Sequence, residues 1–281
     1  PERAFTDVSL RSTLGEDLQR HRFSLDLNEP LIEERLTVRL PLSFETGKPF
    51  WLPDNARWRE SFLLAPSLLC HVRDDLRIGF SLTLQHTDQP AYQGIPVHRG
   101  KPFGGYDWDS SIATSGMRDR YLGHTAQTYV EWDASPVWTL RTGAGLAYSE
   151  VDFEHLGASA FANPDGSITA RAYTLRPYDH SEGDLTFRRY TLYQRATASY
   201  ETGPLAHETV VQGDFARKSE QGRSYFESVA MRNAVHTWIS ANERDTQVDK
   251  AGLFAQDLIA WRQFRLLGGV RADRHESSLG N

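Results

Sequence analysis

Residues 36–45 read LTVRLPLSFE and residues 76–85 read LRIGFSLTLQ, so apolar side chains occupy every second position in both stretches. Successive side chains of a β-strand point to opposite faces, so each stretch predicts a strand with one apolar and one polar face. About eleven such segments of roughly ten residues follow one another along the chain. This pattern is typical of an outer-membrane barrel, with apolar side chains toward lipid and polar ones toward the lumen. We therefore predict an all-β fold, a transmembrane antiparallel up-and-down β-barrel.

Turn signals rich in Gly, Pro, Asn and Asp separate the predicted strands. Strands are expected at 5–14, 18–27, 34–46, 59–71, 76–86, 121–132, 137–149, 189–200, 206–217, 247–260 and 263–274. A turn is expected at Asn28-Glu29-Pro30, and Asn163-Pro164-Asp165-Gly166 predicts a small separate hairpin inside 150–188.

The connections differ in length at the two ends of the predicted strands. Short turns are expected at 28–33, 73–75, 133–136, 201–205 and 261–262, and longer loops at 47–58, 87–120, 150–188 and 218–246. Bacterial barrels have short periplasmic turns and long extracellular loops. A soluble sandwich gives no reason for loops to sort by length in this way.

Composition excludes some classes of protein. The net charge is −6 and no basic stripe is evident, which argues against a nucleic-acid partner. No apolar run is long enough for a transmembrane helix, whereas a barrel strand hides its hydrophobicity by alternation. The single cysteine, Cys70, cannot form an internal disulfide and is interpreted as a small apolar strand residue.

The strand count predicts that the chain is part of a larger barrel. Single-chain bacterial barrels have even numbers of strands, and eleven is odd. The open edges of such a sheet would leave backbone N–H and C=O groups unpaired toward lipid, which is unfavourable. We therefore expect the chain to be a fragment.

Aromatic residues fall near the ends of the predicted strands. They are Trp132, Trp138, Tyr148, Tyr190, Tyr200, Trp261 and Phe264. Such positions are typical of the aromatic girdles at the two membrane interfaces, although ordinary packing of aromatic side chains would also account for them.

Several segments resemble TonB-dependent siderophore receptors. Residues 198–215, ASYETGPLAHETVVQGDF, resemble the family segment F-x-T-G-x-x-x-H-x-L-L-x-G-x-D. Residues 250–257, KAGLFAQD, and 267–273, LGGVRAD, are similar to the family's G-x-Y-x-Q-D and L-x-G-G-R-Y-D. Residues 64–84 resemble a family strand pair, and Gly94-Ile95-Pro96 resembles the G-x-P that opens its third extracellular loop. Ferric-hydroxamate receptors look the most similar.

The resemblance implies a fold and a role. The family has a 22-stranded barrel plugged by an N-terminal domain, and residues 1–281 look like the first eleven strands, without the plug, the TonB box or the later strands. The implied function is ferric siderophore uptake across the outer membrane of a Gram-negative bacterium. Extracellular loops bind the iron chelate, the lumen passes it to the periplasm, and the TonB–ExbB–ExbD complex supplies energy through the plug. Outer-membrane lipid would surround the barrel.

The sequence contains no forceful catalytic motif, so we do not expect an enzyme. A nucleophile elbow, a Walker loop, an H-E-x-x-H motif and a Cys/His ligand set are all missing from the sequence. His86, His98 and His124 could meet near the loop end of two strands, but solvated loop polarity explains them as well. We expect no cofactor and no protein metal ligand, because iron would arrive already wrapped in its chelator.

Aromatic and basic residues in the 87–120 loop are the predicted ligand contacts. The candidates are Tyr92, Arg99, Phe103, Tyr106 and Trp108, with Lys101 beside them and Trp51 and Trp58 as weaker candidates in the preceding loop. Aromatic faces and a few hydrogen bonds suit a bulky chelate, and the cations suit anionic groups. Tyr92 is the strongest candidate because it directly precedes the Gly-x-Pro segment. These aromatics could instead pack the loop against itself.

Two other functions stay open. A passive porin would use an acidic loop at its constriction, which Asp107, Asp109 and Asp119 could provide. A soluble all-β binding module would need its apolar faces packed on each other. An upstream plug distinguishes a receptor from a porin, and the need for detergent during extraction distinguishes both from a soluble module.

Overall fold

The computed structural model describes residues 4–14, 19–48, 58–90, 97–98, 101–102, 118–158, 178–230 and 235–279. The side chains of 97–98, 101–102, 155–158, 178–182, 226–230 and 235–242 are not part of this description. The described elements are all strands, and no helix long and apolar enough to cross a membrane occurs among them.

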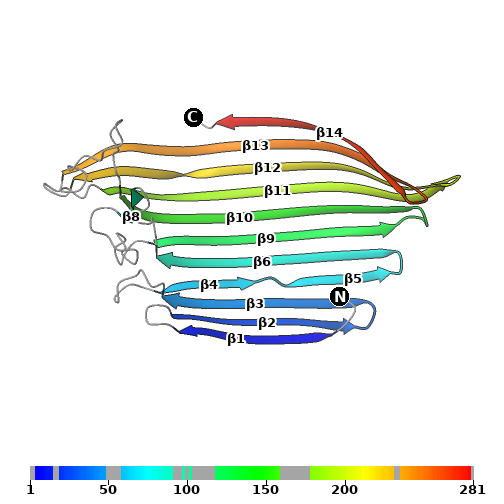
Figure 1. Ribbon diagram of the computed structural model, residues 1–281, viewed down its shortest axis with the longest axis horizontal. Coiled ribbons are helices and arrows are strands. Elements are labelled where there is room, and N and C mark those ends of the chain that lie inside the picture. Colours follow the sequence, from blue (N-terminus) through cyan, green and yellow to red (C-terminus); the bar gives the residue numbers. More distant parts are fainter. Residues whose placement is uncertain are drawn as a thin grey trace.

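The strands form one antiparallel meander in which neighbours in sequence are neighbours in space (Figure 1). Their bounds are β1 Phe5–Leu14, β2 Gln19–Ile32, β3 Leu36–Lys48, β4 Arg59–Leu64, β5 Ser67–Arg73, β6 Leu76–Pro90, β9 Arg118–Asp133, β10 Trp138–Ala158, β11 Tyr178–Thr202, β12 Leu205–Ala230, β13 Val235–Trp261 and β14 Phe264–Leu279. A separate two-stranded ribbon joins β7 Val97–His98 and β8 Lys101–Pro102.

The predicted strand 59–71 is interrupted by a proline. β4 ends at Leu64 and β5 begins at Ser67, and both lie between β3 and β6. Pro66 cannot donate a backbone hydrogen bond, so the regular ladder breaks there. The amide of Leu82 still donates to the carbonyl of Pro66 at 2.9 Å, and the amide of Ala65 donates to Pro41 at 2.9 Å. The two halves therefore occupy one position, and the sheet has the predicted eleven.

One predicted turn is wrong. Asn28, Glu29 and Pro30 lie within β2, and the reversal occurs at Glu33–Arg35, where Glu34 has a left-handed φ of 58°. The register shifts between Pro30 and Ile32, so the proline occupies an irregular pair near the strand end. The other short turns form close to their predicted positions, including Arg262-Gln263, where Arg262 has a φ of 50°.

The strands are also longer than predicted. Most of 218–246 belongs to β12 and β13, and both ends of the predicted loop 150–188 belong to β10 and β11. The NPDG hairpin within that loop lies outside the described residues. Within β12, residues 218–224 carry charged and small side chains on both faces, so no hydrophobic alternation marks this extension. Backbone pairing continues there regardless, because it depends on the N–H and C=O groups.

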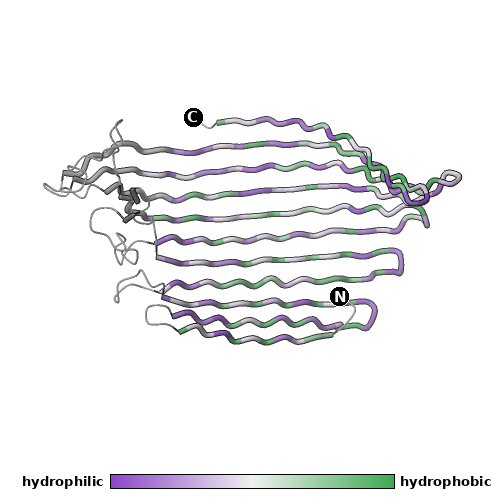
Figure 2. The backbone as a smooth tube through the Cα atoms, viewed as in Figure 1, coloured by the Kyte–Doolittle hydropathy of each residue, from purple (hydrophilic) through white to green (hydrophobic). Residues whose placement is uncertain are grey.

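The two faces of the sheet differ sharply in polarity, as the alternating colours along the strands show (Figure 2). Here the polar face is the one that carries Arg39, Arg77 and Arg141, and the apolar face is its opposite. Large side chains on the apolar face are well exposed, including Phe80 at 44% and Leu192 at 54%. Among the described side chains only Ala198 and Val210 are buried hydrophobics. The apolar face therefore has no packing layer within the described residues.

Two rows of aromatic residues bound the apolar face. Trp138 and Tyr200 lie near the short turns, on β10 and β11. Tyr148 and Tyr190 lie ten positions further along the same two strands and on the same face. Ten residues at about 3.3 Å each, tilted as in a barrel, span about 25 Å, the height of a lipid-facing apolar band. These aromatics occupy the predicted girdle positions, and we call the region between the rows the apolar band.

Candidate functional site on the polar face

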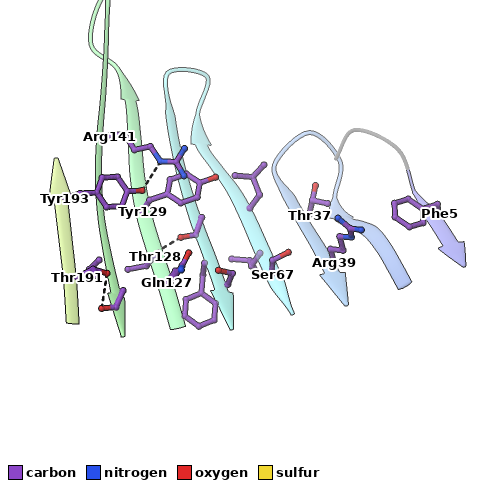
Figure 3. A pocket seen from close by; sticks show the side chains of 17 residues that line it. Phe5, Thr37, Arg39, Ser67, Gln127, Thr128, Tyr129, Arg141, Thr191 and Tyr193 are labelled. Carbon is purple, nitrogen blue, oxygen red and sulfur yellow. Dashed lines mark hydrogen bonds between the residues drawn. The ribbon is translucent and has the colours of Figure 1, made fainter. Parts of the chain in front are cut away.

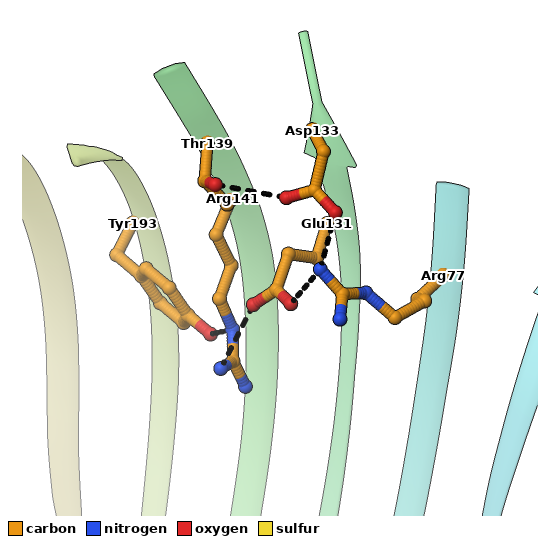
Figure 4. Close-up of polar contacts among 6 residues, drawn as sticks. All are labelled: Arg77, Glu131, Asp133, Thr139, Arg141 and Tyr193. Atoms are coloured by element: carbon orange, nitrogen blue, oxygen red, sulfur yellow. Dashed lines mark hydrogen bonds and ion pairs between the residues drawn. The ribbon is translucent and has the colours of Figure 1, made fainter. Parts of the chain in front are cut away.

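An ion-pair network covers the polar face close to the short turns (Figure 4). Arg77 on β6 lies 3.1 Å from Glu131 and 2.8 Å from Asp133, both on β9. Arg141 on β10 lies 3.5 Å from the other Glu131 oxygen, and the Thr139 hydroxyl donates to Asp133 at 2.8 Å. Each carboxylate thus serves donors from neighbouring strands. The network ties β6, β9 and β10 together, and its two arginines balance its two carboxylates.

Arg141 is also held between two tyrosines. Its guanidinium lies 3.8 Å from the centroid of the Tyr129 ring, and its Nε donates to the Tyr193 hydroxyl at 3.2 Å. Both rings lie over glycines of the adjacent strand. A Cβ added at Gly79 would come within 2.2 Å of the Tyr129 ring, and one at Gly143 within 2.5 Å of the Tyr193 ring. The glycines are therefore needed for the tyrosines to lie flat against the wall.

Beside this network, on the side away from the short turns, the polar face is hollowed (Figure 3). The hollow has a volume of about 650 Å³ and extends from Phe5 and Arg39 to Thr191 and Tyr193. Its lining mixes hydroxyl and amide groups and two arginines with glycines and several apolar residues. Such a surface can form hydrogen bonds to water or to another protein surface, and it has no nucleophile paired with a base.

Other arginines of the polar face are paired in the same way. Arg39 makes two hydrogen bonds to Asp26, at 3.0 and 2.7 Å, and Arg20 lies 2.7 Å from Glu45. At the other end of the sheet Arg271 lies 2.8 Å from Asp273 and 3.3 Å from Asp214. These arginines and carboxylates of the polar face thus compensate one another in pairs.

The predicted ligand contacts cannot be placed. Tyr92, Arg99, Phe103, Tyr106, Trp108 and Trp51 all lie outside the described residues, and of Lys101 only the backbone is described, in β8. Trp58 is described: it is 37% exposed and stacks on His21 with 6.3 Å between ring centroids. The loop-binding hypothesis therefore stays a prediction.

The three histidines are only partly accounted for. His86 and His124 lie on the neighbouring strands β6 and β9, diagonal to each other in register, while the side chain of His98 is outside the described set. His124 stacks on Tyr148 with 6.1 Å between centroids. Within the described residues there is no group of three or more side chains able to hold a metal ion.

Two residues of the quoted sequence motifs meet on the apolar face near the short turns. His207 Nδ1 lies 2.8 Å from one oxygen of Asp257, and the Thr209 hydroxyl donates to the other at 2.8 Å. The Tyr200 ring stacks on His207 with 4.8 Å between centroids and an interplanar angle of 4°. The cluster links β11, β12 and β13. The cluster gives a structural reason for His207 in the family-like segment 198–215 and for Asp257 in the segment 250–257.

We expect His207→Ala to loosen this end of the sheet. The substitution removes the partner of Asp257 and uncovers the Tyr200 ring, so the β12–β13 pairing loses its side-chain support. The denaturant midpoint of the folded protein should fall. Arg217→Gln, on the same strand and face, is the control for the loss of a polar side chain. An equal fall of the denaturant midpoint in the two variants would contradict a specific role for His207.

Sequence reasoning missed the Arg141 cluster because its members come from three strands whose pairing was unknown. The available signal was a glycine at a polar-face position opposite a tyrosine, as with Gly143 and Tyr193 or Gly79 and Tyr129. Given the register, that pattern would have predicted flat rings against the wall.

The sheet has an exposed apolar band between two rows of aromatic residues on one face and ion-paired polar side chains on the other. This combination defines the wall of a transmembrane β-barrel. Residues 71–281 match the family model described as TonB dependent receptor-like, beta-barrel. The chain belongs to this TonB-dependent receptor-like β-barrel family. No curated protein sequence matches it.

Solved structures share the fold at low sequence identity. The ferric-catecholate import receptor Fiu from E. coli K12 is 19% identical with a TM-score of 0.74, and the match covers 99% of this chain and 42% of that one. The siderophore receptor PiuA from Acinetobacter baumannii is 16% identical with a TM-score of 0.75 and coverages of 99% and 43%. The outer-membrane ferripyoverdine receptor of Pseudomonas aeruginosa is 13% identical, with a TM-score of 0.76 and coverages of 100% and 38%. The chain thus spans less than half of each receptor.

Proposed function

We propose that this chain forms barrel wall in an outer-membrane receptor that imports a ferric siderophore. The family match over residues 71–281 is the observation that carries this proposal. The structurally similar Fiu, PiuA and ferripyoverdine receptors bear names that refer to iron chelates or siderophores, which supports the same class of cargo. The resemblance to ferric-hydroxamate receptors stays a prediction about the chelate subtype.

In this proposal the apolar band contacts outer-membrane lipid of a Gram-negative bacterium, and the polar face lines the lumen. The exposed apolar side chains support a lipid environment, because a soluble all-β module would bury them against a second layer. The residues Tyr92, Arg99, Phe103, Tyr106, Trp108 and Trp51 remain the proposed chelate contacts of the extracellular loops. The iron is cargo held by its own chelator, so the protein needs no cofactor, metal ligand or catalytic group.

Energy is proposed to come from the TonB–ExbB–ExbD complex acting through a plug domain. The ion-paired arginines of the polar face support a lumen that is filled by another protein surface. Such pairs can still form hydrogen bonds with a neighbouring protein, and they attract free ions only weakly.

Iron uptake that depends on TonB is the expected result. The receptor containing this barrel would be produced in a Gram-negative host that lacks its own siderophore receptors. Accumulation of radioactive iron would be measured for a panel of chelates. Uptake should fall to background when the TonB gene is deleted, because active import requires the coupled complex.

The same panel distinguishes the porin alternative. A passive channel would admit small unrelated solutes and would keep its transport rate without TonB. Uptake that persists at an unchanged rate in the deletion strain would contradict the proposed function.

A further inference from the structure

A second hollow lies on the polar face at the edge of the apolar band that is farther from the short turns, and three of its six lining residues are cations. It has a volume of about 330 Å³ and is lined by Arg189, Ala216, Lys218, Val248, Lys250 and His275. The lining thus contains three side chains that are cationic at neutral pH, one imidazole and no carboxylate. We call this site the basic hollow.

The ladder brings these cations together from four strands. Arg189 on β11 pairs in register with Lys218 on β12, and Lys250 on β13 pairs with His275 on β14. Ala216 is the register partner of Lys250 and keeps the space between the long side chains open. Residues opposite each other on neighbouring strands have their Cβ atoms about 5 Å apart, so the cationic groups can reach one bound anion.

The basic hollow differs from the wall below it. Arg77, Arg141 and Arg271 each have a carboxylate within 3.5 Å. Arg189 and Lys250 make no ion pair among the described residues. Like charges brought together in this way are unfavourable unless an anion joins them. Arg195, the register partner of Arg141, likewise makes no ion pair among the described residues. What distinguishes the basic hollow is that several cations line one space, which indicates a place for external negative charge.

The carboxylate that pairs with Lys218 is shared with a cation outside the basic hollow. Glu220 on β12 lies 3.5 Å from Lys218 but 2.6 Å from Arg244. It stands above the apolar band, and the hydrogen bond from Arg244 is the main reason that its pKa is lowered. One carboxylate shared by Lys218 and Arg244 leaves the hollow with a surplus of positive charge.

We propose that the basic hollow holds the negative charge of the imported cargo, which is therefore an anionic ferric chelate with catecholate or carboxylate donors. This inference rests on the proposed function. A full set of singly charged hydroxamates cancels the charge on Fe³⁺, whereas a full set of doubly charged catecholates leaves the complex anionic. A neutral chelate would leave the cations of the hollow uncompensated, and an anionic one would pair with them.

The face on which these residues lie favours a cargo in the lumen over a lipid head group. Arg189 and Lys218 lie on the polar face, while their sequence neighbours Arg188 and Arg217 lie on the apolar face as register partners of Tyr148 and Tyr190. Arg217 is held by two hydrogen bonds of 2.8 Å to Asp249. Anionic lipid would meet Arg188 and Arg217, not the basic hollow.

This neighbour pattern provides matched variants. Arg189→Gln and Lys218→Gln, singly and together, remove charge from the hollow, and Arg188→Gln and Arg217→Gln remove it one residue away on the other face. Binding of a ferric tris-catecholate and of a neutral ferric tris-hydroxamate would be measured on cells producing each variant. All values are normalised to the amount of receptor in the outer membrane.

The expected result is preferential binding of the ferric tris-catecholate. The double Arg189→Gln, Lys218→Gln variant should weaken this binding by at least about tenfold and reduce its salt dependence. The Arg188→Gln and Arg217→Gln variants should stay within about twofold of the parent.

Two other outcomes would overturn the inference. One of them leaves the proposed receptor function intact, and the other refutes it as well. Binding and TonB-dependent import of the neutral chelate alone, unaffected by the double variant, would refute the basic hollow as a cargo site and leave the proposed siderophore receptor function intact. Failure to bind or import any ferric chelate would refute the proposed function and the inference with it.

Discussion

Replacing Phe80 by arginine is expected to keep most of the protein from reaching its folded, membrane-inserted state. Phe80 is 44% exposed on the apolar face of β6, and it lies between the levels of the two aromatic rows. A charged side chain facing lipid near the midplane of a barrel costs about 2–4 kcal/mol. The measurement is the amount of heat-modifiable, folded protein in the outer membrane, which should fall severalfold.

Ser81→Arg is the matched control, since the next residue of the same strand points to the opposite face. Ser81 lines the larger hollow, where a long polar side chain has space beside hydroxyl and amide groups. Its folded yield should remain close to that of the parent. Equal losses from Phe80→Arg and Ser81→Arg would contradict the assignment of the two faces.

Gly143→Ala is expected to destabilise the barrel wall and to displace Tyr193. The added Cβ would come within 2.5 Å of the tyrosine ring, which is closer than carbon atoms can approach. The ring must move away, and the 3.2 Å hydrogen bond from Arg141 Nε to its hydroxyl is lost with it. Overpacking of this kind costs about 1–3 kcal/mol, and urea titration of the folded barrel would measure it.

Gly213→Ala serves as the control for simply adding a methyl group. Gly213 lies on β12, and no atom lies within 4 Å of the position that its Cβ would occupy. This variant should be as stable as the parent or slightly more stable, because glycine weakens strand interiors. A stable Gly143→Ala variant would mean that Tyr193 does not lie flat over the glycine.

The strands within the apolar band could be predicted from sequence because lipid on one side and polar surroundings on the other impose alternation. Residues 36–45 and 76–85 lie in β3 and β6 as expected, and the turn after Trp261 also forms close to its predicted position. The interruption at Pro66 followed from the missing N–H of proline, although the predicted strand ran through it.

The upper halves of β10 to β13 could not be predicted in the same way. Beyond the apolar band both faces meet water, so segments such as 218–224 carry charged and small residues without a period. The Arg141 cluster required the register between three strands, which no local pattern encodes. The loop residues proposed to contact the chelate, Tyr92 foremost, lie outside the described residues, so that part of the site stays a prediction.

The extension of β12 to Ala230 has a mechanical consequence. From Phe215, near the upper aromatic row, the strand continues for fifteen residues, and paired, tilted strands of that length rise about 40 Å. A hydrogen-bonded ribbon of this kind is stiff, so it holds the tip of the strand at a fixed distance from the apolar band. Under the proposed function, the first contact with a chelate would occur well clear of the lipid head groups, at a height that an antibody or a phage could also reach.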